Sequence, residues 1–141
     1  MSNLSFNEGY KEFTINGDES RKIRINTSDL NLMKRIVDLK NGIKEKEKMY
    51  KGLSASANPE NVEEIAEQLL IIEQEVRKEV DEVFNASICD TVFGSLNCMS
   101  PAGGVPIVWG FLNALIPEIE KTLKSEKKKM EKYTEKVKEF K

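Results

Sequence analysis

Residues 91–117 form a stretch without a single Asp, Glu, Lys or Arg. The glycines and prolines that interrupt it are Gly94, Pro101, Gly103, Gly104 and Pro106. The longest helix that the stretch allows, residues 106–116, is about 11 residues long, whereas crossing a bilayer takes about 20. We therefore expect the uncharged stretch to be the part that the charged remainder of a soluble domain buries.

The rest of the chain alternates in charge, although the net charge is only −2. Residues 21–51 hold ten bases and four acids, residues 60–90 ten acids and two bases, and residues 118–141 nine Lys and six Glu. We expect the first two segments to be antiparallel helices of complementary charge. The alternative is a small nucleic-acid-binding or regulatory protein that uses the basic segment 21–51. Its phosphate-binding side chains would be Lys34, Arg35, Lys40, Lys44, Lys46, Lys48 and Lys51. A single aromatic residue, Tyr50, lies between these lysines for base stacking, which disfavours this alternative.

A β-hairpin is predicted over residues 10–26. Polar and apolar residues alternate on both sides of an Asn16-Gly17-Asp18-Glu19 turn, which places Phe13, Ile15, Ile23 and Ile25 on one buried face. Because an isolated hairpin is marginal in water, this one should lie against helices or extend the sheet of a partner.

Helices are predicted over residues 29–51, 59–84, 87–93 and 106–125, and residues 126–141 form a Lys/Glu-rich helical extension. The caps expected from the sequence are Thr27-Ser28-Asp29 for the first helix, Asn58-Pro59 for the second and Gly94 for the end of the third. Leu32, Ile36, Leu39 and Ile43 form the apolar stripe of the first helix. The fold class is therefore mainly α (α+β), with an N-terminal β-hairpin packed on a three- to four-helix array, and residues 1–125 form a single globular domain.

The last helix is too long for the domain that should contain it. Residues 106–140 as one helix span about 52 Å, whereas a domain of this size has a diameter of roughly 37 Å. The helix must therefore overhang, bend or pack on another subunit. Its apolar stripe continues through Met130, Tyr133, Val137 and Phe140. The run Lys127-Lys128-Lys129 is interpreted as a solvated helix end, with a partner-binding or oligomerising arm as the alternative.

The chain has no histidine, which removes imidazole from general acid–base catalysis, nucleophile pairs and metal sites. Cys89 and Cys98, nine residues apart, suit neither a redox motif nor a zinc site, and we expect two small buried thiols. Glutamates one helical turn apart, such as Glu75 and Glu79, are expected on a solvated face. No enzyme activity, cofactor or metal is expected. The sparse cysteines and a first segment without signal-peptide character favour the cytoplasm.

Apolar side chains crowd the first turns of the last helix. Trp109, Phe111, Leu112, Leu115 and Ile116 point in several directions within about one and a half turns. The simplest interpretation is a plain core. The alternative is that Trp109 or Phe111 faces outward and anchors a partner helix, as aromatic residues do at many interfaces.

The order of these elements resembles that of a known family. The segments Val80-Asp81-Glu82-Val83-Phe84, Cys89-Asp90-Thr91-Val92-Phe93-Gly94 and Phe111-Leu112-Asn113-Ala114-Leu115-Ile116 are similar to the acidic helix, Phe-Gly steps and Phe-Leu helix of tail assembly chaperones. These proteins serve long-tailed phages and prophages of Gram-positive bacteria. In the first Phe-Gly step of this chain, Asn85 replaces the glycine that follows Phe84.

The resemblance implies a non-catalytic helper in the host cytoplasm that is absent from the finished virion. Its partners would be the tape-measure protein, which it keeps soluble, the tail-tube protein that polymerises around it, and a frameshift-extended form of itself. A homo-oligomer is possible under this expectation, whereas no membrane or nucleic acid is expected. The candidate partner-binding residues are Trp109, Phe111, Leu112, Leu115, Ile116, Phe84 and Phe93.

Overall fold

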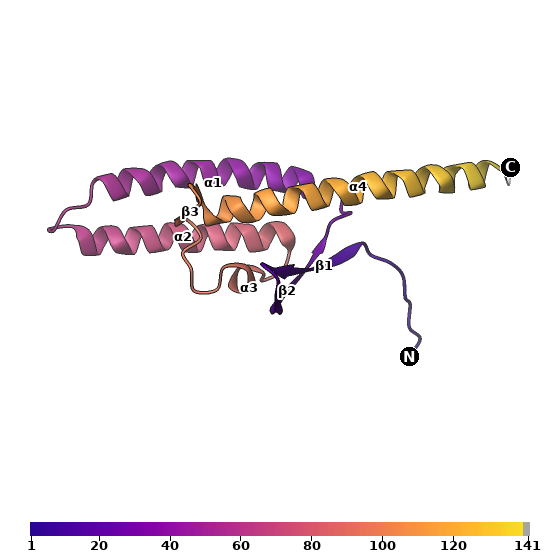
Figure 1. Cartoon of the computed structure of the whole chain (residues 1–141), viewed down its shortest axis with the longest axis horizontal. Coiled ribbons are helices and arrows are strands. Elements are labelled where there is room, and N and C mark those ends of the chain that lie inside the picture. Colours follow the sequence, from indigo (N-terminus) through magenta and orange to yellow (C-terminus); the bar gives the residue numbers. More distant parts are fainter. Residues whose placement is uncertain (140–141) are drawn as a thin grey trace.

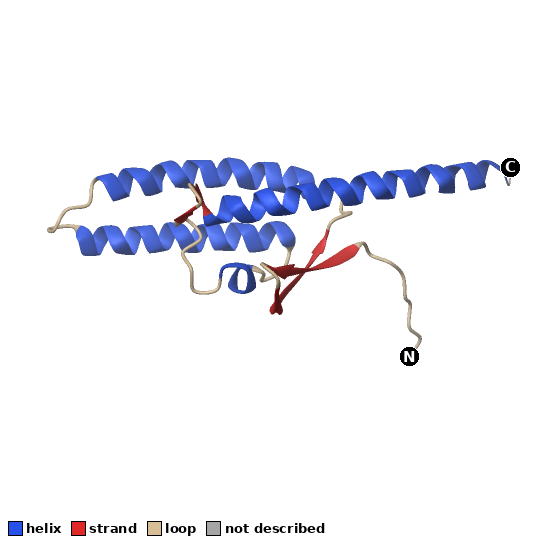
Figure 2. Cartoon of the chain, in the orientation of Figure 1, coloured by secondary structure: helices blue, strands red, loops and turns tan. Residues whose placement is uncertain are grey.

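A computed structural model describes the backbone of residues 1–139 and the side chains of residues 1–137. The element order is β1 (Tyr10–Ile15), β2 (Asp18–Asn26), α1 (Leu32–Ala55), α2 (Val62–Phe84), α3 (Cys89–Phe93), β3 (Pro101–Ala102), β4 (Val105–Pro106) and α4 (Ile107–Glu139). The predicted fold class is confirmed, because the chain is mainly helical with an N-terminal β-hairpin and a long C-terminal helix (Figures 1 and 2).

The three long helices lie side by side, but α4 is shifted along the other two. Helices α1 and α2 form an antiparallel pair. Helix α4 starts partway along this pair and continues beyond the opposite end, so the overhang expected from its length is present (Figure 1). The hairpin β1–β2 and the short helix α3 lie at the side of this bundle. None of the helices described has the length and apolar character that crossing a membrane requires.

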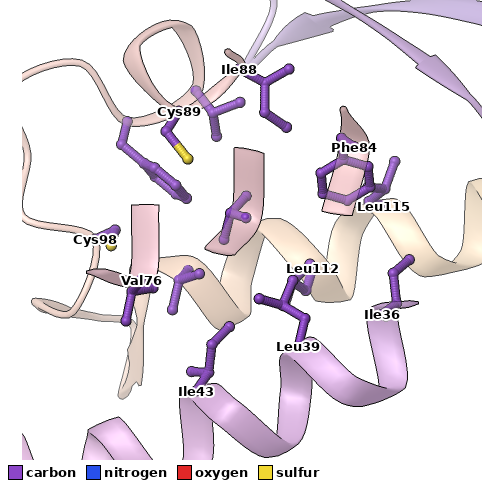
Figure 3. Close-up of a cluster of buried hydrophobic side chains, with 14 of the residues drawn as sticks. Ile36, Leu39, Ile43, Val76, Phe84, Ile88, Cys89, Cys98, Leu112 and Leu115 are labelled. Carbon is purple, nitrogen blue, oxygen red and sulfur yellow. The ribbon is translucent and has the colours of Figure 1, made fainter. Parts of the chain in front are cut away.

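The core confirms the apolar stripe predicted for the first helix. In α1, the buried residues are Leu32, Ile36, Leu39 and Ile43, as predicted. They pack with Val76 and Val80 of α2 and with Leu112, Leu115 and Ile119 of α4 (Figure 3). The uncharged stretch supplies much of this core, including Val92, Phe93, Cys98, Met99, Val108 and Leu112. Seven of the 27 residues of this stretch are buried and the others are partly or fully exposed, so burial accounts for only part of the missing charge.

The predicted hairpin is present, but its second strand begins at Asp18, so the turn is shorter than the predicted residues 16–19. Phe13 pairs with Ile23, Lys11 pairs with Ile25, and the register shifts between Thr14 and Ile15. Asn16 and Gly17 both have positive φ, at 51° and 74°, which is the backbone conformation that a two-residue hairpin turn needs at both central residues to match the right-handed twist of the strands. Ile23 and Ile25 are buried, while Phe13 and Ile15 are only partly covered.

Two helix starts differ from the prediction because the expected cap side chains form turns instead. The first helix begins at Leu32 rather than residue 29, since Asp29 Oδ1 accepts the backbone N–H of Asn31 at 2.9 Å. The second begins at Val62 rather than residue 59, since Asn58 Oδ1 accepts the backbone N–H groups of Glu60 and Asn61. In both places an Asx-type turn precedes the helix.

The remaining boundaries also shift. The first helix ends at Ala55 rather than residue 51, so residues 52–55 are helical as well. The third begins at Cys89 rather than residue 87, where Asp81 Oδ1 accepts the N–H groups of Ile88 and Cys89 at 2.9 and 3.0 Å. Asn85, which replaces the glycine of the first Phe-Gly step, ends the second helix in the left-handed conformation (φ 51°, ψ 40°), and the predicted cap at Gly94 is confirmed.

The last helix starts at Ile107 and continues through Glu139 without a break at the expected boundary between residues 125 and 126. The two-residue strands β3 and β4, joined by Gly103 and Gly104 with φ of 63° and 86°, were not predicted. The exposed residues Met130, Tyr133 and Val137 lie on the overhang, whereas Phe140, expected in the same stripe, lies outside the described residues.

Candidate partner-binding site

An apolar groove of about 390 Å³ lies between the β-hairpin and α4. One wall is the hairpin, the other is a face of α4, and α3 closes the base. Its apolar lining residues are Phe13, Ile15, Ile23, Val92, Phe93, Ile107, Phe111, Ala114 and Leu115. A groove lined in this way can accept apolar side chains from a partner.

Two polar contacts between distant segments hold the hairpin in place on either side of the groove. Arg21 donates hydrogen bonds to the carbonyl oxygens of Thr91 and Val92 at the end of α3, at 3.0 and 2.5 Å. Lys11 of β1 forms an ion pair with Glu118 of α4 at 3.1 Å. Lys11 also donates a hydrogen bond to the Glu118 carboxylate in this contact. The hydrogen bond and the positive charge of nearby Lys121 hold the pKa of the Glu118 carboxyl below its usual value. The hairpin is thus tied to α3 and to α4, and the groove stays open between them.

Small residues leave room on the α4 wall. Gly110 and Ala114 are one helical turn apart on the groove face, and a Cβ atom added at Gly110 would meet no other heavy atom within 4 Å. Phe111 lies between them on the same face and makes edge-on contacts with Phe84 and Phe93, at centroid distances of 6.2 and 5.9 Å. The α4 side of the groove therefore presents an aromatic ring that packs on two others, with small residues beside it.

The structure separates the seven predicted partner-binding residues into two groups. Four of them, Phe84, Phe93, Leu112 and Leu115, are buried in the core, so the simpler interpretation of a plain core holds for them. Three are partly exposed, namely Trp109, Phe111 and Ile116. Phe93, Phe111 and Leu115 line the groove together.

The polar edge of the Trp109 ring contacts another helix of the same chain. Its indole Nε1–H donates to Glu47 of α1 at 3.2 Å, which ties the first turn of α4 to α1. Sequence reasoning missed the hairpin wall and the residues Gly110 and Ala114. The spacing of four between these two small residues was the available signal for an open helix face.

A second polar cluster fixes the loop that connects α3 to α4. The buried carboxylate of Glu73 forms an ion pair with Arg77 at 2.6 Å and accepts the backbone N–H of Cys98 at 3.2 Å. Arg77 donates to the carbonyl oxygens of Gly94 and Leu96 at 2.8 and 2.7 Å. The cluster is a structural clamp, because each charged group is satisfied within it.

The two cysteines are free and buried, as predicted (Figure 3). Burial, with the negative charge of Glu73 nearby, raises the pKa of the Cys98 thiol to about 12. Burial and the neighbouring Asp81 also raise the pKa of Cys89. Among the described residues, no group of three or more His, Cys, Asp or Glu side chains is placed to hold a metal ion.

The charge complementarity between α1 and α2 is present as ion pairs. Lys46 of α1 pairs with both Glu75 and Glu79 of α2. Both glutamates thus contribute to the helix pair, while Glu75 is exposed, as expected of a solvated face, and Glu79 is partly covered. Within the basic segment, Lys34 pairs with Asp38, Arg35 with Asp29, and Lys51 with Glu47. Since four of the seven basic side chains proposed for phosphate contacts already have acidic partners, the helix-pairing interpretation is favoured.

Comparisons of this chain with protein-family models, with curated proteins and with solved structures gave no match. Its function is therefore proposed from its own residues and geometry.

Proposed function

We propose that this protein is a non-catalytic tail assembly chaperone of a phage or prophage, which binds the tape-measure protein and keeps it soluble while the tail tube polymerises. The observation that carries the proposal is the apolar groove between the hairpin and α4. The resemblance of segments 80–94 and 111–116 to this family supplies the identity of the client.

The groove suits a helical client. An amphipathic helix presents apolar side chains at intervals of three and four residues, and it docks such a row into an apolar groove. A long helical client exposes this stripe to water until something covers it, and each Å² covered is worth about 25 cal/mol. In the groove, the stripe would lie over Phe111, next to Ala114, with Phe13 and Ile15 on the opposite wall.

The acidic residues of α2 support solubility of such a complex. Glu63, Glu64 and Glu67 stand in its first turns and Glu60 lies just before it, all without a neighbouring base in sequence, and an acidic surface opposes aggregation of a complex. The host cytoplasm as location, the tail-tube protein as second partner and a frameshift-extended form remain expectations from the family resemblance.

Co-expression with the tape-measure protein of the same genome tests the proposal. The soluble fraction of the tape-measure protein is measured with the wild-type chain, with Ala114→Phe, which fills the groove, and with Asn113→Phe as the matched control. Asn113 is exposed and precedes Ala114 on α4, but it does not line the groove. We expect the wild type and Asn113→Phe to raise the soluble fraction, and Ala114→Phe to lose most of this effect.

Two results would refute the proposal. A tape-measure protein that is no more soluble with the wild-type chain than without it would exclude the chaperone function. Equal activity of Ala114→Phe and Asn113→Phe, both folded by circular dichroism, would exclude the groove as the binding site.

A further inference from the structure

The overhang of α4, defined here as residues 124–139, exposes a continuation of the helix face that is buried in the domain. Val108, Leu112, Leu115 and Ile119 are buried on that face. Met130, Tyr133 and Val137 follow at helical intervals on the same side, and they are 58%, 61% and 38% exposed. The part of α4 beyond the domain thus has a packing face with nothing packed on it.

At the opposite end of the molecule, α1 and α2 lack a third helix that packs on them. The tip of the α1–α2 pair, defined here as residues 51–71, extends past the start of α4 (Figure 1). The hydrogen bond between Trp109 and Glu47 marks where α4 begins along α1. At the tip, two long helices therefore lie together without the third helix that covers them elsewhere.

The uncovered side of the tip is apolar. Glu73 of α2 faces the loop that leads into α4, as its hydrogen bond from Cys98 requires. Leu70, Ala66 and Val62 precede Glu73 at helical intervals on the same side, and Leu70 and Val62 are 53% and 51% exposed. Apolar surface of this kind is normal for a helix face that packs against another helix.

The two surfaces have opposite charge. The overhang holds seven Lys and four Glu, whereas the tip holds four Glu and one Lys. Lys127 and Lys129 flank the apolar stripe of the overhang, and Glu63 and Glu67 lie beside the apolar side of the tip. Charge complementarity of this kind selects the partner and its register.

We infer that the overhang of one copy packs on the tip of a second copy, in line with the α4 helix of that second copy. The overhang would use the same face that α4 already uses against α1 and α2 within the domain. It is long enough, because its 16 residues span about 24 Å, while residues 62–71 of the tip span about 15 Å. Since the overhang and the tip lie at opposite ends of one chain, the contact can form only between copies.

The contact is heterologous, so it leaves a free overhang and a free tip at the two ends of each assembly. Such a contact grows into open chains unless its geometry closes a ring. Association should therefore increase with protein concentration and weaken with salt, because part of the attraction is electrostatic. The inference concerns copies of this chain alone and stands independently of the proposed client.

Sedimentation velocity and light scattering on the purified full chain test this contact. Leu70→Lys places a charge on the uncovered side of the tip, and Ile71→Lys is its matched control. The two side chains are neighbours in α2 and equally exposed, at 53% each, but Ile71 points away from the Leu70–Ala66–Val62 side. Tyr133→Glu makes the corresponding change on the overhang.

We expect the wild type and Ile71→Lys to associate as concentration rises, and Leu70→Lys and Tyr133→Glu to associate at least about tenfold more weakly. The decisive step is a mixture of the last two variants. Leu70→Lys keeps an intact overhang and Tyr133→Glu keeps an intact tip, so the mixture should form a one-to-one complex that grows no further. A wild type that stays monomeric at all concentrations, identical behaviour of Leu70→Lys and Ile71→Lys, or a mixture that stays monomeric would each overturn the inference.

Discussion

Replacing Glu73 with alanine should cost far more stability than any surface substitution on α2. The Glu73 side chain is only 7% exposed, and its ion-pair partner Arg77 is 18% exposed. The carboxylate accepts two hydrogen bonds, one from Arg77 and one from the backbone N–H of Cys98. Alanine removes both acceptors and leaves Arg77 without its buried counter-charge.

The magnitude follows from these contacts. A hydrogen bond to a charged group contributes about 1.5–3 kcal/mol, and removal of one partner of a buried ion pair costs about 3–5 kcal/mol. We therefore expect Glu73→Ala to lower the free energy of unfolding by about 3–5 kcal/mol, the range for the broken pair. Glu73→Gln keeps a neutral acceptor for Cys98, so it should cost about 1–3 kcal/mol, as for a hydrogen bond that loses its charge.

Urea unfolding followed by circular dichroism measures these changes, and hydrogen exchange at the Cys98 amide reports on the loop itself. Gln74→Ala is the control, because Gln74 is exposed and adjacent; it should change stability by less than about 0.5 kcal/mol. The reasoning is refuted if Glu73→Ala is no more destabilising than Gln74→Ala, or if the Cys98 amide exchanges at the wild-type rate in Glu73→Ala.

Three further predictions address the cysteines, the core and the hairpin. Because burial raises the pKa of Cys98 to about 12, iodoacetamide at pH 7.5 should modify it at least about 100-fold more slowly in the folded chain than in urea, since the thiolate reacts; equal rates by mass spectrometry would contradict this. Leu112→Ala, at a position that is 0% exposed, should cost about 2–5 kcal/mol in urea unfolding, and a loss below about 1 kcal/mol would disprove its place in the core. The NMR titration midpoint of Glu118 should lie below the usual 4.5, and the Lys11–Glu118 contact should persist at pH 5 and be lost as the pH falls through that lowered midpoint. Lys11→Ala should raise the midpoint, and an unchanged midpoint would contradict the contact.

Patterns that depend on neighbouring residues were predictable. The stripe of Leu32, Ile36, Leu39 and Ile43 is buried as the sequence indicates, because helical periodicity alone decides which side chains share a face. Asn16 and Gly17 predicted the hairpin turn for a similar reason, since few residue pairs accept positive φ at both positions. Local chemistry was sufficient for these elements.

Helix starts were less predictable because the same side chain can either cap a helix or form a turn before it. Asp29 and Asn58 are good N-cap residues, but each can also hydrogen-bond to a backbone N–H two residues later and form a turn. The cap of α3 comes from Asp81, seven residues before the N–H group of Ile88 that it accepts. Only the packing of α3 against the end of α2 decides this contact.

The groove depends on contacts between residues far apart in sequence, and so it could not be predicted. Arg21 reaches Thr91 and Val92, and Lys11 reaches Glu118. The sequence shows all of these residues as ordinary surface charges or apolar positions, and no periodicity pairs them. For the same reason, the sequence did not show that Phe84 and Phe93, two of the candidate partner-binding residues, pack on Phe111.

Helix α4 connects the two proposals because it would present different faces to different partners. The groove uses Ile107, Phe111 and Ala114, whereas head-to-tail contact would use the face of Ile119 that continues to Met130 and Tyr133. If both contacts form, association of copies leaves every groove open, and successive copies related by a shift along α4 would present their grooves in a row. A client helix longer than one groove would then be covered by several copies at once, and its affinity would rise through effective concentration rather than through new contacts. Tyr133→Glu separates the two effects, since it should leave binding of a short client peptide unchanged and weaken binding of a long one.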